Sequence, residues 1–189
     1  MNHSHQRGVT LVELIIVITL LALLASVATP SLTGLLERQD RRAALHDLFN
    51  GLHMARTEAV SRAMRVTVCP LEEDSECGGD WNQPVHVFLD PRNQRALEDE
   101  ARLLRVMEPP GRGTREIRVG NRGYLQFAAT GMVHGTLGNI TYCPESGTRE
   151  HAGQVIINMG GRPRMARDLS GDGIVQGASG DPVSCPGQG

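Results

Sequence analysis

The sequence predicts an α+β fold in which one long N-terminal helix packs on an antiparallel β-sheet head. Three observations lead to this prediction. An uncharged, largely apolar run extends from Leu14 to Thr29, and no comparable run occurs later in the 189-residue chain. A helical amphipathic pattern follows this run. The rest of the chain alternates short β-rich segments with turn residues.

The N-terminus changes abruptly from polar to apolar at Gly8. A helix over residues 9–30 would be about 30 Å long, which matches the core of a bilayer. A secretory signal peptide is the alternative, but here the break precedes the apolar run instead of following it. Glu13 also lies inside this segment, where a charge near the bilayer centre costs about 2.5–3.5 kcal/mol. A subunit that leaves the membrane to join a polymer can use such a charge.

This N-terminus resembles the class III prepilin signal of type IV pilin-like proteins, on the residues Arg7-Gly8-Val9-Thr10-Leu11-Val12-Glu13. The resemblance implies that prepilin peptidase removes residues 1–8 as a leader by cutting between Gly8 and Val9. It also implies methylation of the new N-terminus. Glu13 would then pair with the α-amino group of Val9 in a neighbouring subunit. Val9 stands where the family usually has phenylalanine, but the glycine on which cleavage depends is present.

Pro30 ends the apolar run. Proline inside a helix removes a hydrogen bond and favours a kink. Pilin-like proteins commonly carry a proline here, which implies a role in assembly because the lower helix can then bend or melt in a filament. The alternative is a simple break where the chain leaves the membrane.

Residues 31–65 are predicted to form an amphipathic helix. Apolar residues recur there at three- and four-residue spacing, with charged residues between them. The apolar positions are Leu45, Leu48, Phe49, Leu52, Ala55, Ala59, Val60 and Ala63. A coiled-coil seam is the alternative, but sustained heptads with complementary flanking charges are missing.

Residues 66–189 are predicted to form the β-rich head, which ends in a Gly-rich tail from Asp168 onward. The candidate strands are 66–69, 85–89, 103–107, 115–119, 124–127, 139–142 and 154–158.

The head resembles one pilin subgroup, the GspH pseudopilins of type II secretion and the FimT/FimU minor pilins. The resemblance implies the type IV pilin fold and covers nearly the whole mature chain. Its main marks, in chain order, are Cys69-Pro70, Asp80-Trp81, Val87-Phe88-Leu89-Asp90, Leu125-Gln126-Phe127, Tyr142-Cys143 and Gly161-Arg162-Pro163-Arg164. Gln83-Pro84 replaces a glycine usual after the tryptophan, which indicates a differently shaped turn.

Four cysteines follow the apolar segment, and an exported head favours two disulfides. Zinc binding is the alternative, although no Cys-x-x-Cys spacing supports it. Sequence distance together with the family likeness predicts the pairs Cys69–Cys77 and Cys143–Cys185.

No catalytic set, cofactor motif or metal site is predicted. The spacing of His46 and His53 is typical of an ordinary helix surface. The segment Asp168–Gly173 begins like a calcium loop, but Ser179 stands where a bidentate glutamate is required, so a polar turn is favoured. We therefore expect a structural subunit and not an enzyme.

A run of arginines near the C-terminus is the most distinctive predicted surface. In an extended segment Arg162 and Arg164 would share a face, and Arg167 follows closely. Guanidinium groups can grip phosphates in bidentate fashion. In FimT-like pilins a Gly-Arg-x-Arg motif is associated with DNA binding, so the resemblance implies a DNA contact here. An edge-strand charge pattern is the alternative.

We expect a minor pilin that takes part in assembly or initiation of a type IV pilus, with DNA uptake as a further role. The alternative is a GspH-type pseudopilin of type II secretion. The resemblance implies other pilins, prepilin peptidase and an inner-membrane assembly platform as partners. It places the chain in the bacterial inner membrane as a single-pass protein with a periplasmic head, and then in the pilus or pseudopilus.

Overall fold

The computed structural model describes residues 9–120, 122–133 and 138–186, with residues 27–32 described by their backbone alone. One helix, α1 (Leu11–Ser61), precedes the strands, and two short 3-10 helices, η1 (Glu100–Arg102) and η2 (Arg149–His151), lie in connections between them. The strands are β1 (Val66–Pro70), β2 (Val85–Leu89), β3 (Leu103–Met107), β4 (Thr114–Arg118), β5 (Leu125–Phe127), β6 (Gly138–Cys143), β7 (Gly153–Ile157) and β8 (Pro163–Met165). The chain divides into two compact units, residues 1–36 and 37–189.

The first unit contributes the N-terminal part of α1. Its large apolar side chains are exposed, from Val9 at 72% and Leu11 at 74% to Leu24 at 68%. The helix continues through Pro30 without interruption, although proline supplies no N–H to the helical ladder. Within the residues described, no helix combines the length and the mean hydropathy that a membrane crossing needs.

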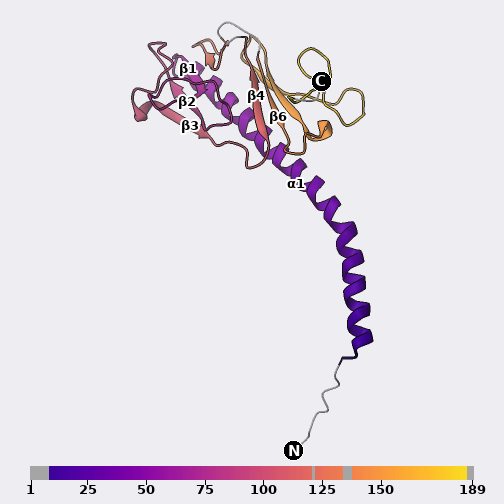
Figure 1. Ribbon diagram of the computed structural model, residues 1–189. Helices are drawn as coiled ribbons and strands as arrows, with labels where there is room; N and C mark the ends of the chain where they lie inside the picture. Colours follow the sequence, from indigo (N-terminus) through magenta and orange to yellow (C-terminus); the bar gives the residue numbers. More distant parts are fainter. Residues whose placement is uncertain (1–8, 121, 134–137, 187–189) are drawn as a thin grey trace, which may run out of the picture. The chain divides into compact units, whose positions relative to one another are not determined.

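The second unit is the head, and it includes the C-terminal part of α1. This part of the helix buries one face, at the spacing that the sequence predicted, through Ala44, Leu45, Leu48, Leu52, Ala55 and Ala59. These side chains share one core with residues of both β-sheets. Figure 1 shows the strands gathered along this part of α1. The helix therefore serves as one layer of the head.

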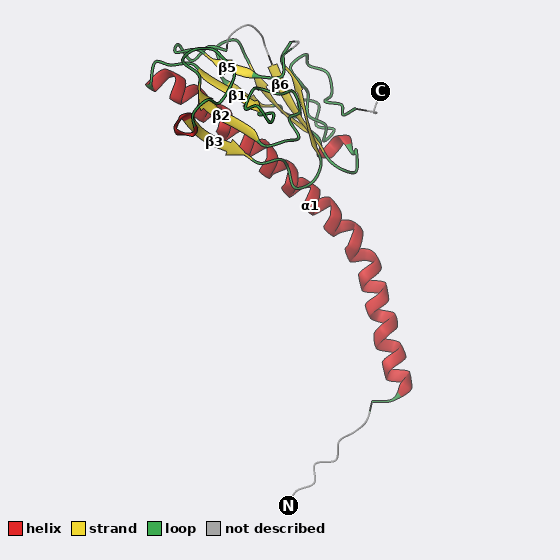
Figure 2. Ribbon diagram, turned by 60° about the vertical axis from the view of Figure 1, so that its left-hand side comes forward, coloured by secondary structure: helices red, strands yellow, loops and turns green. Residues whose placement is uncertain are grey.

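The first sheet has four strands in the order β3-β2-β1-β5, and all its neighbours are antiparallel. Val68 of β1 lies opposite Val87 of β2 and Leu125 of β5, so apolar side chains meet across the sheet. Figure 2 shows these strands side by side. The second sheet is antiparallel too, with the order β4-β6-β7-β8.

The strands predicted from sequence correspond to β1–β7, with ends that differ by at most one residue. β8 was not predicted as a strand. It pairs with β7 through Ile156 opposite Arg164, and it begins at Pro163. An edge strand tolerates proline because one row of its backbone groups needs no partner in the sheet.

Candidate functional site

The processing and assembly residues lie at the start of α1. Gly8 lies outside the described residues, whereas Val9 is exposed just before the helix. Thr10 caps α1, because its Oγ1 accepts a hydrogen bond from the backbone N–H of Glu13 at 3.2 Å. Glu13 is exposed in the first helical turn. It is also the only charged residue between Val9 and Leu36.

Both predicted disulfide pairs are present in the head. Cys69 and Cys77 are bonded with their Cα atoms 5.5 Å apart, and Cys143 and Cys185 with theirs 5.7 Å apart. The first bond closes a short loop after β1. The second fixes the C-terminal tail to the end of β6, where Cys143 and Cys185 join Ala152 and Val183 in a small second core. The Cys143–Cys185 bond thus adds a covalent link to the few apolar contacts of the tail.

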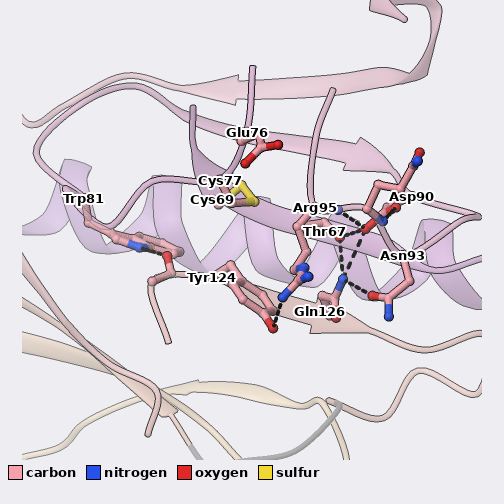
Figure 3. Close-up of a disulfide and its surroundings, with 12 residues drawn as sticks. Thr67, Cys69, Glu76, Cys77, Trp81, Asp90, Asn93, Arg95, Tyr124 and Gln126 are labelled. Atoms are coloured by element: carbon pink, nitrogen blue, oxygen red, sulfur yellow. Dashed lines mark hydrogen bonds between the residues drawn. A yellow bond between two sulfur atoms is a disulfide. The ribbon is translucent and has the colours of Figure 1, made fainter. Parts of the chain in front are cut away.

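A buried carboxylate organises the loop that follows β2 (Figure 3). Asp90 is 3% exposed. Its oxygens accept hydrogen bonds from Thr67 Oγ1 at 2.8 Å and from Gln126 Nε2 at 3.1 Å. They also accept the backbone N–H groups of Gln94 at 2.8 Å and Arg95 at 3.1 Å. Sequence reasoning noted Asp90 only as part of a family pattern, since nothing local to it reveals burial.

The predicted arginines lie at and beside the edge strand β8. Arg162, Arg164 and Arg167 are exposed, and no ion pair within the described part of the chain involves them. Gly161 makes the turn before them possible. Its φ is +71°, and an added Cβ would lie 1.9 Å from the backbone oxygen of Gly131. Only glycine fits so close an approach, so the glycine of the Gly-Arg-x-Arg motif shapes the backbone.

Arg164 and Arg167 line a groove between α1 and β8, which we call the α1–β8 groove. Its larger part has a volume of about 640 Å³ and is lined by His46 and Phe49 of α1 and by Pro163, Arg164, Met165 and Arg167. An adjoining part of about 170 Å³ shares His46 and Met165 and adds Arg41 and Arg42. Arg162 does not line either part.

Sequence reasoning missed the contribution of α1 to this groove. Arg38, Arg42, His46 and Asn50 recur every four residues, so they follow one another along one helix face, and all four are exposed. That spacing was the available signal. What the sequence does not reveal is that β8, more than a hundred residues later, lies beside this face.

In the polar turn that begins at Asp168, the Asp168 carboxylate accepts hydrogen bonds from the backbone of the turn itself. The backbone N–H groups of Gly171 and Gly173 donate to it at 2.7 and 2.8 Å. These two bonds, that of Gly173 first, lower the pKa of Asp168. Across the described residues, no group of three or more His, Cys, Asp or Glu side chains is arranged to hold a metal ion.

The fold and the N-terminal motif define a pilin-like subunit. The chain matches the family described as "Type II transport protein GspH" over residues 44–161 and the "Prokaryotic N-terminal methylation motif" over residues 3–29. The first match spans more than half of the sequence, and the chain belongs to the GspH family. No curated protein matches it significantly.

Two solved structures of a minor pilin support the fold. The minor pilin FimU of Pseudomonas aeruginosa strain PAO1 is similar at 20% identity, with a TM-score of 0.55 over 69% of this chain and 91% of FimU. A second crystal form of FimU gives a TM-score of 0.50 over 67% and 92% of the two chains, also at 20% identity. The minor pseudopilin EpsH from the Type 2 Secretion System of Vibrio cholerae has 10% identity and a TM-score of 0.47, over 67% and 94%. The likeness to FimU confirms the predicted type IV pilin-like α+β fold.

Proposed function

We propose that this chain is a minor pilin that helps to initiate or cap a type IV pilus. The observation that carries the proposal is the exposed apolar segment from Val9 to Leu24, which contains one charge, Glu13. Large apolar side chains from Val9 to Leu24 are uncovered, and a surface of this kind is normally covered by lipid or by another protein. We infer that the inner membrane covers it first, with the head in the periplasm, and that other pilins cover it in the filament.

The charge of Glu13 favours transfer of the helix from the membrane to the filament. A carboxylate buried without a partner is strongly unfavourable, and an oppositely charged group beside it offsets much of that cost. In the filament, the α-amino group of a neighbouring subunit's first residue would supply that charge. This pairing requires that prepilin peptidase cut between Gly8 and Val9, and that an inner-membrane platform bring the subunits together.

A GspH-type pseudopilin of type II secretion is the alternative within the same class. The family description favours it. The two disulfides and the arginines beside β8 favour the pilus.

Deletion of the gene in its own bacterium separates the two. We expect loss of surface pili, measured in sheared fractions, while protein secretion continues. Loss of secretion with normal piliation would instead identify a pseudopilin.

Mass spectrometry of the mature chain tests the processing step. It should find Val9 at the N-terminus, and an intact Met1 or a cut after Ala28 would contradict the filament proposal.

DNA binding is a second candidate function of the same subunit. The specific observation in its favour is three exposed arginines, Arg162, Arg164 and Arg167, without ion-pair partners in the described structure. Binding through phosphates would be weak, with a dissociation constant of about 10⁻⁴–10⁻⁶ M, and would fall with added salt. We expect the double variant Arg162→Gln, Arg164→Gln to lose binding of DNA to the full chain in detergent. Equal binding by the two proteins would remove this candidate and leave the assembly role.

A further inference from the structure

The α1–β8 groove carries positive charge that the protein does not neutralise. Four arginines line it, Arg41, Arg42, Arg164 and Arg167, and no described residue lining its two parts is an Asp or Glu. Asp47 of α1 does not compensate them, because it pairs with Arg105 at 2.5 Å. The groove therefore favours an anion.

The arginines of α1 are close enough to oppose one another. Burial, and then the charges of Arg42 and Arg38, lower the pKa of Arg41. Arg41 is held in place, since its Nη1 donates to the backbone oxygens of Glu150 at 2.8 Å and Ala152 at 3.3 Å. Arg42 is exposed, and no ion pair within the described structure involves it. A bound anion would relieve this repulsion.

The floor of the groove is apolar and includes an aromatic ring. Phe49 is partly buried against the core of the head, and Pro163 and Met165 of β8 line the same part of the groove. The Phe49 and His53 rings are 6.2 Å apart at their centroids. Proteins that bind a single nucleic acid strand combine a positively charged groove with aromatic side chains on which bases stack, and this groove offers one such ring. A duplex keeps its bases stacked inside, so it would leave this floor unused.

The groove volume agrees with a ligand of nucleotide size. The larger part, about 640 Å³, lies within the range of about 300–1,000 Å³ typical of small-ligand sites.

Addition of an extended peptide strand to β8 is disfavoured, because Pro163 has no N–H to donate. Recognition at this edge must therefore use side chains.

We propose that the α1–β8 groove binds a single strand of nucleic acid, and that Arg42 and His46 of α1 contact this ligand together with Arg164 and Arg167. This inference rests on the DNA-binding function proposed above and specifies its site and its ligand. The bound strand would follow α1, with phosphates at the arginines and a base over Phe49.

The test is a fluorescence anisotropy titration of the full chain in detergent with a labelled single-stranded oligothymidine, at several salt concentrations. Arg42→Gln is the decisive variant, because Arg42 is exposed and lies outside the predicted arginine motif. Arg118→Gln is the matched control. It removes an exposed arginine from β4, the opposite edge of the same sheet.

For Arg42→Gln we expect weaker binding and a slope of log Kobs against log salt that is smaller by about 0.7, the contribution of one phosphate contact to a single strand. Arg118→Gln should match the wild type. If Arg164→Gln weakens binding while Arg42→Gln does not, the groove proposal is wrong and DNA binding through the motif stands. If the wild type binds no DNA at low salt, the DNA-binding function itself fails. Tighter binding of a duplex, or equal binding of polyglutamate, would overturn the single-strand assignment.

Discussion

The backbone N–H of Glu13 donates to Thr10 Oγ1 at 3.2 Å, so the carboxylate expected to pair in a filament also lies in the first turn of its own helix. Thr10 and Glu13 have the spacing of a capping box, in which a threonine is followed three residues later by Glu or Gln. A negative charge is also favourable at a helix N-terminus. Loss of Glu13 therefore has two separable consequences, one local and one between subunits.

Glu13→Gln separates these consequences. Glutamine is accepted in a capping box, so this variant loses the charge while the backbone N–H at position 13 can still donate to Thr10 Oγ1. We expect it to accumulate in the membrane and to enter filaments poorly when sheared pili are probed for the subunit. Thr10→Ala is the matched control, since it removes a cap worth about 0.5–2 kcal/mol and retains the charge. Normal incorporation of Glu13→Gln would mean that the pairing model is wrong.

Asp90 should contribute more to stability than a surface aspartate of the head. In Asp90→Ala, the buried Thr67 hydroxyl and the part-buried backbone N–H groups of Gln94 and Arg95 lose their acceptor, whereas Gln126 Nε2 keeps Asn93 Oδ1. Each unsatisfied buried donor costs about 1–3 kcal/mol, so the free energy of unfolding should fall by about 3 kcal/mol or more. Asp99→Ala is the comparison, because exposed Asp99 accepts one N–H, that of Ala101, and should cost about 1 kcal/mol. Thermal unfolding followed by fluorescence of Trp81, the single tryptophan, measures both, and similar losses would refute the expectation.

Much of this fold can be predicted from the sequence because its signals are local. The buried face of α1 recurs at helical spacing, and β1–β7 are short apolar segments between turn residues. β8 gives a weaker signal, since Arg-Pro-Arg-Met is short, contains a proline and has no β-branched or aromatic residue. The pairing of β8 with β7 depends on tertiary structure, which the local sequence pattern does not show.

The groove and the Asp90 contacts could not be predicted for a related reason. Asp90 directly follows β2 and is indistinguishable from a turn residue until Thr67 and Gln126 are placed beside it. Arg42 and Arg164 belong to segments 122 residues apart in sequence. The periodicity within each segment does not indicate that Arg42 and Arg164 line the same groove.

Gly161 should stabilise the folded backbone of the segment that carries Arg162 and Arg164. In Gly161→Ala the new Cβ would collide with the backbone oxygen of Gly131, at a φ of +71° that alanine rarely adopts. Such backbone strain costs about 1–3 kcal/mol, so the unfolding temperature should fall. Gly171→Ala is a matched control: its φ is +78°, but no atom lies within 4 Å of the added Cβ. Equal losses for the two variants would show that the contact with Gly131 contributes nothing.

The two disulfides should differ in their contribution to stability. The Cys143–Cys185 bond joins residues 42 positions apart and the Cys69–Cys77 bond residues 8 apart. Loop-closure entropy predicts stabilisation of about 4 and about 2.5 kcal/mol, respectively. We expect the pair Cys143→Ala, Cys185→Ala to lower the unfolding temperature more than Cys69→Ala, Cys77→Ala. Peptide mapping without reduction should recover both bonds, and free thiols at all four positions would contradict an exported head.

The contact between Glu37 and His151 should make the head sensitive to acid. His151 Nδ1 lies 2.5 Å from Glu37 Oε2 and joins η2 to α1. The hydrogen bond with His151 is the main cause that lowers the pKa of Glu37, with smaller contributions from Ser146, the His151 charge and Arg112, while burial opposes them.

A carboxyl group whose pKa is lowered by folding stabilises the folded state above its ordinary pKa, here 4.5. That contribution is lost as the pH falls through the lower pKa of the folded state. Glu37→Gln removes the carboxylate, so the wild type should unfold at a higher temperature than this variant above about pH 4.5, and the difference should shrink in stronger acid. Thermal unfolding of the full chain in detergent, repeated across this pH range, measures the difference. Glu150→Gln, an exposed neighbour on η2, should show no such pH dependence. A constant difference between wild type and Glu37→Gln at every pH would mean that the contact contributes by packing and not by charge.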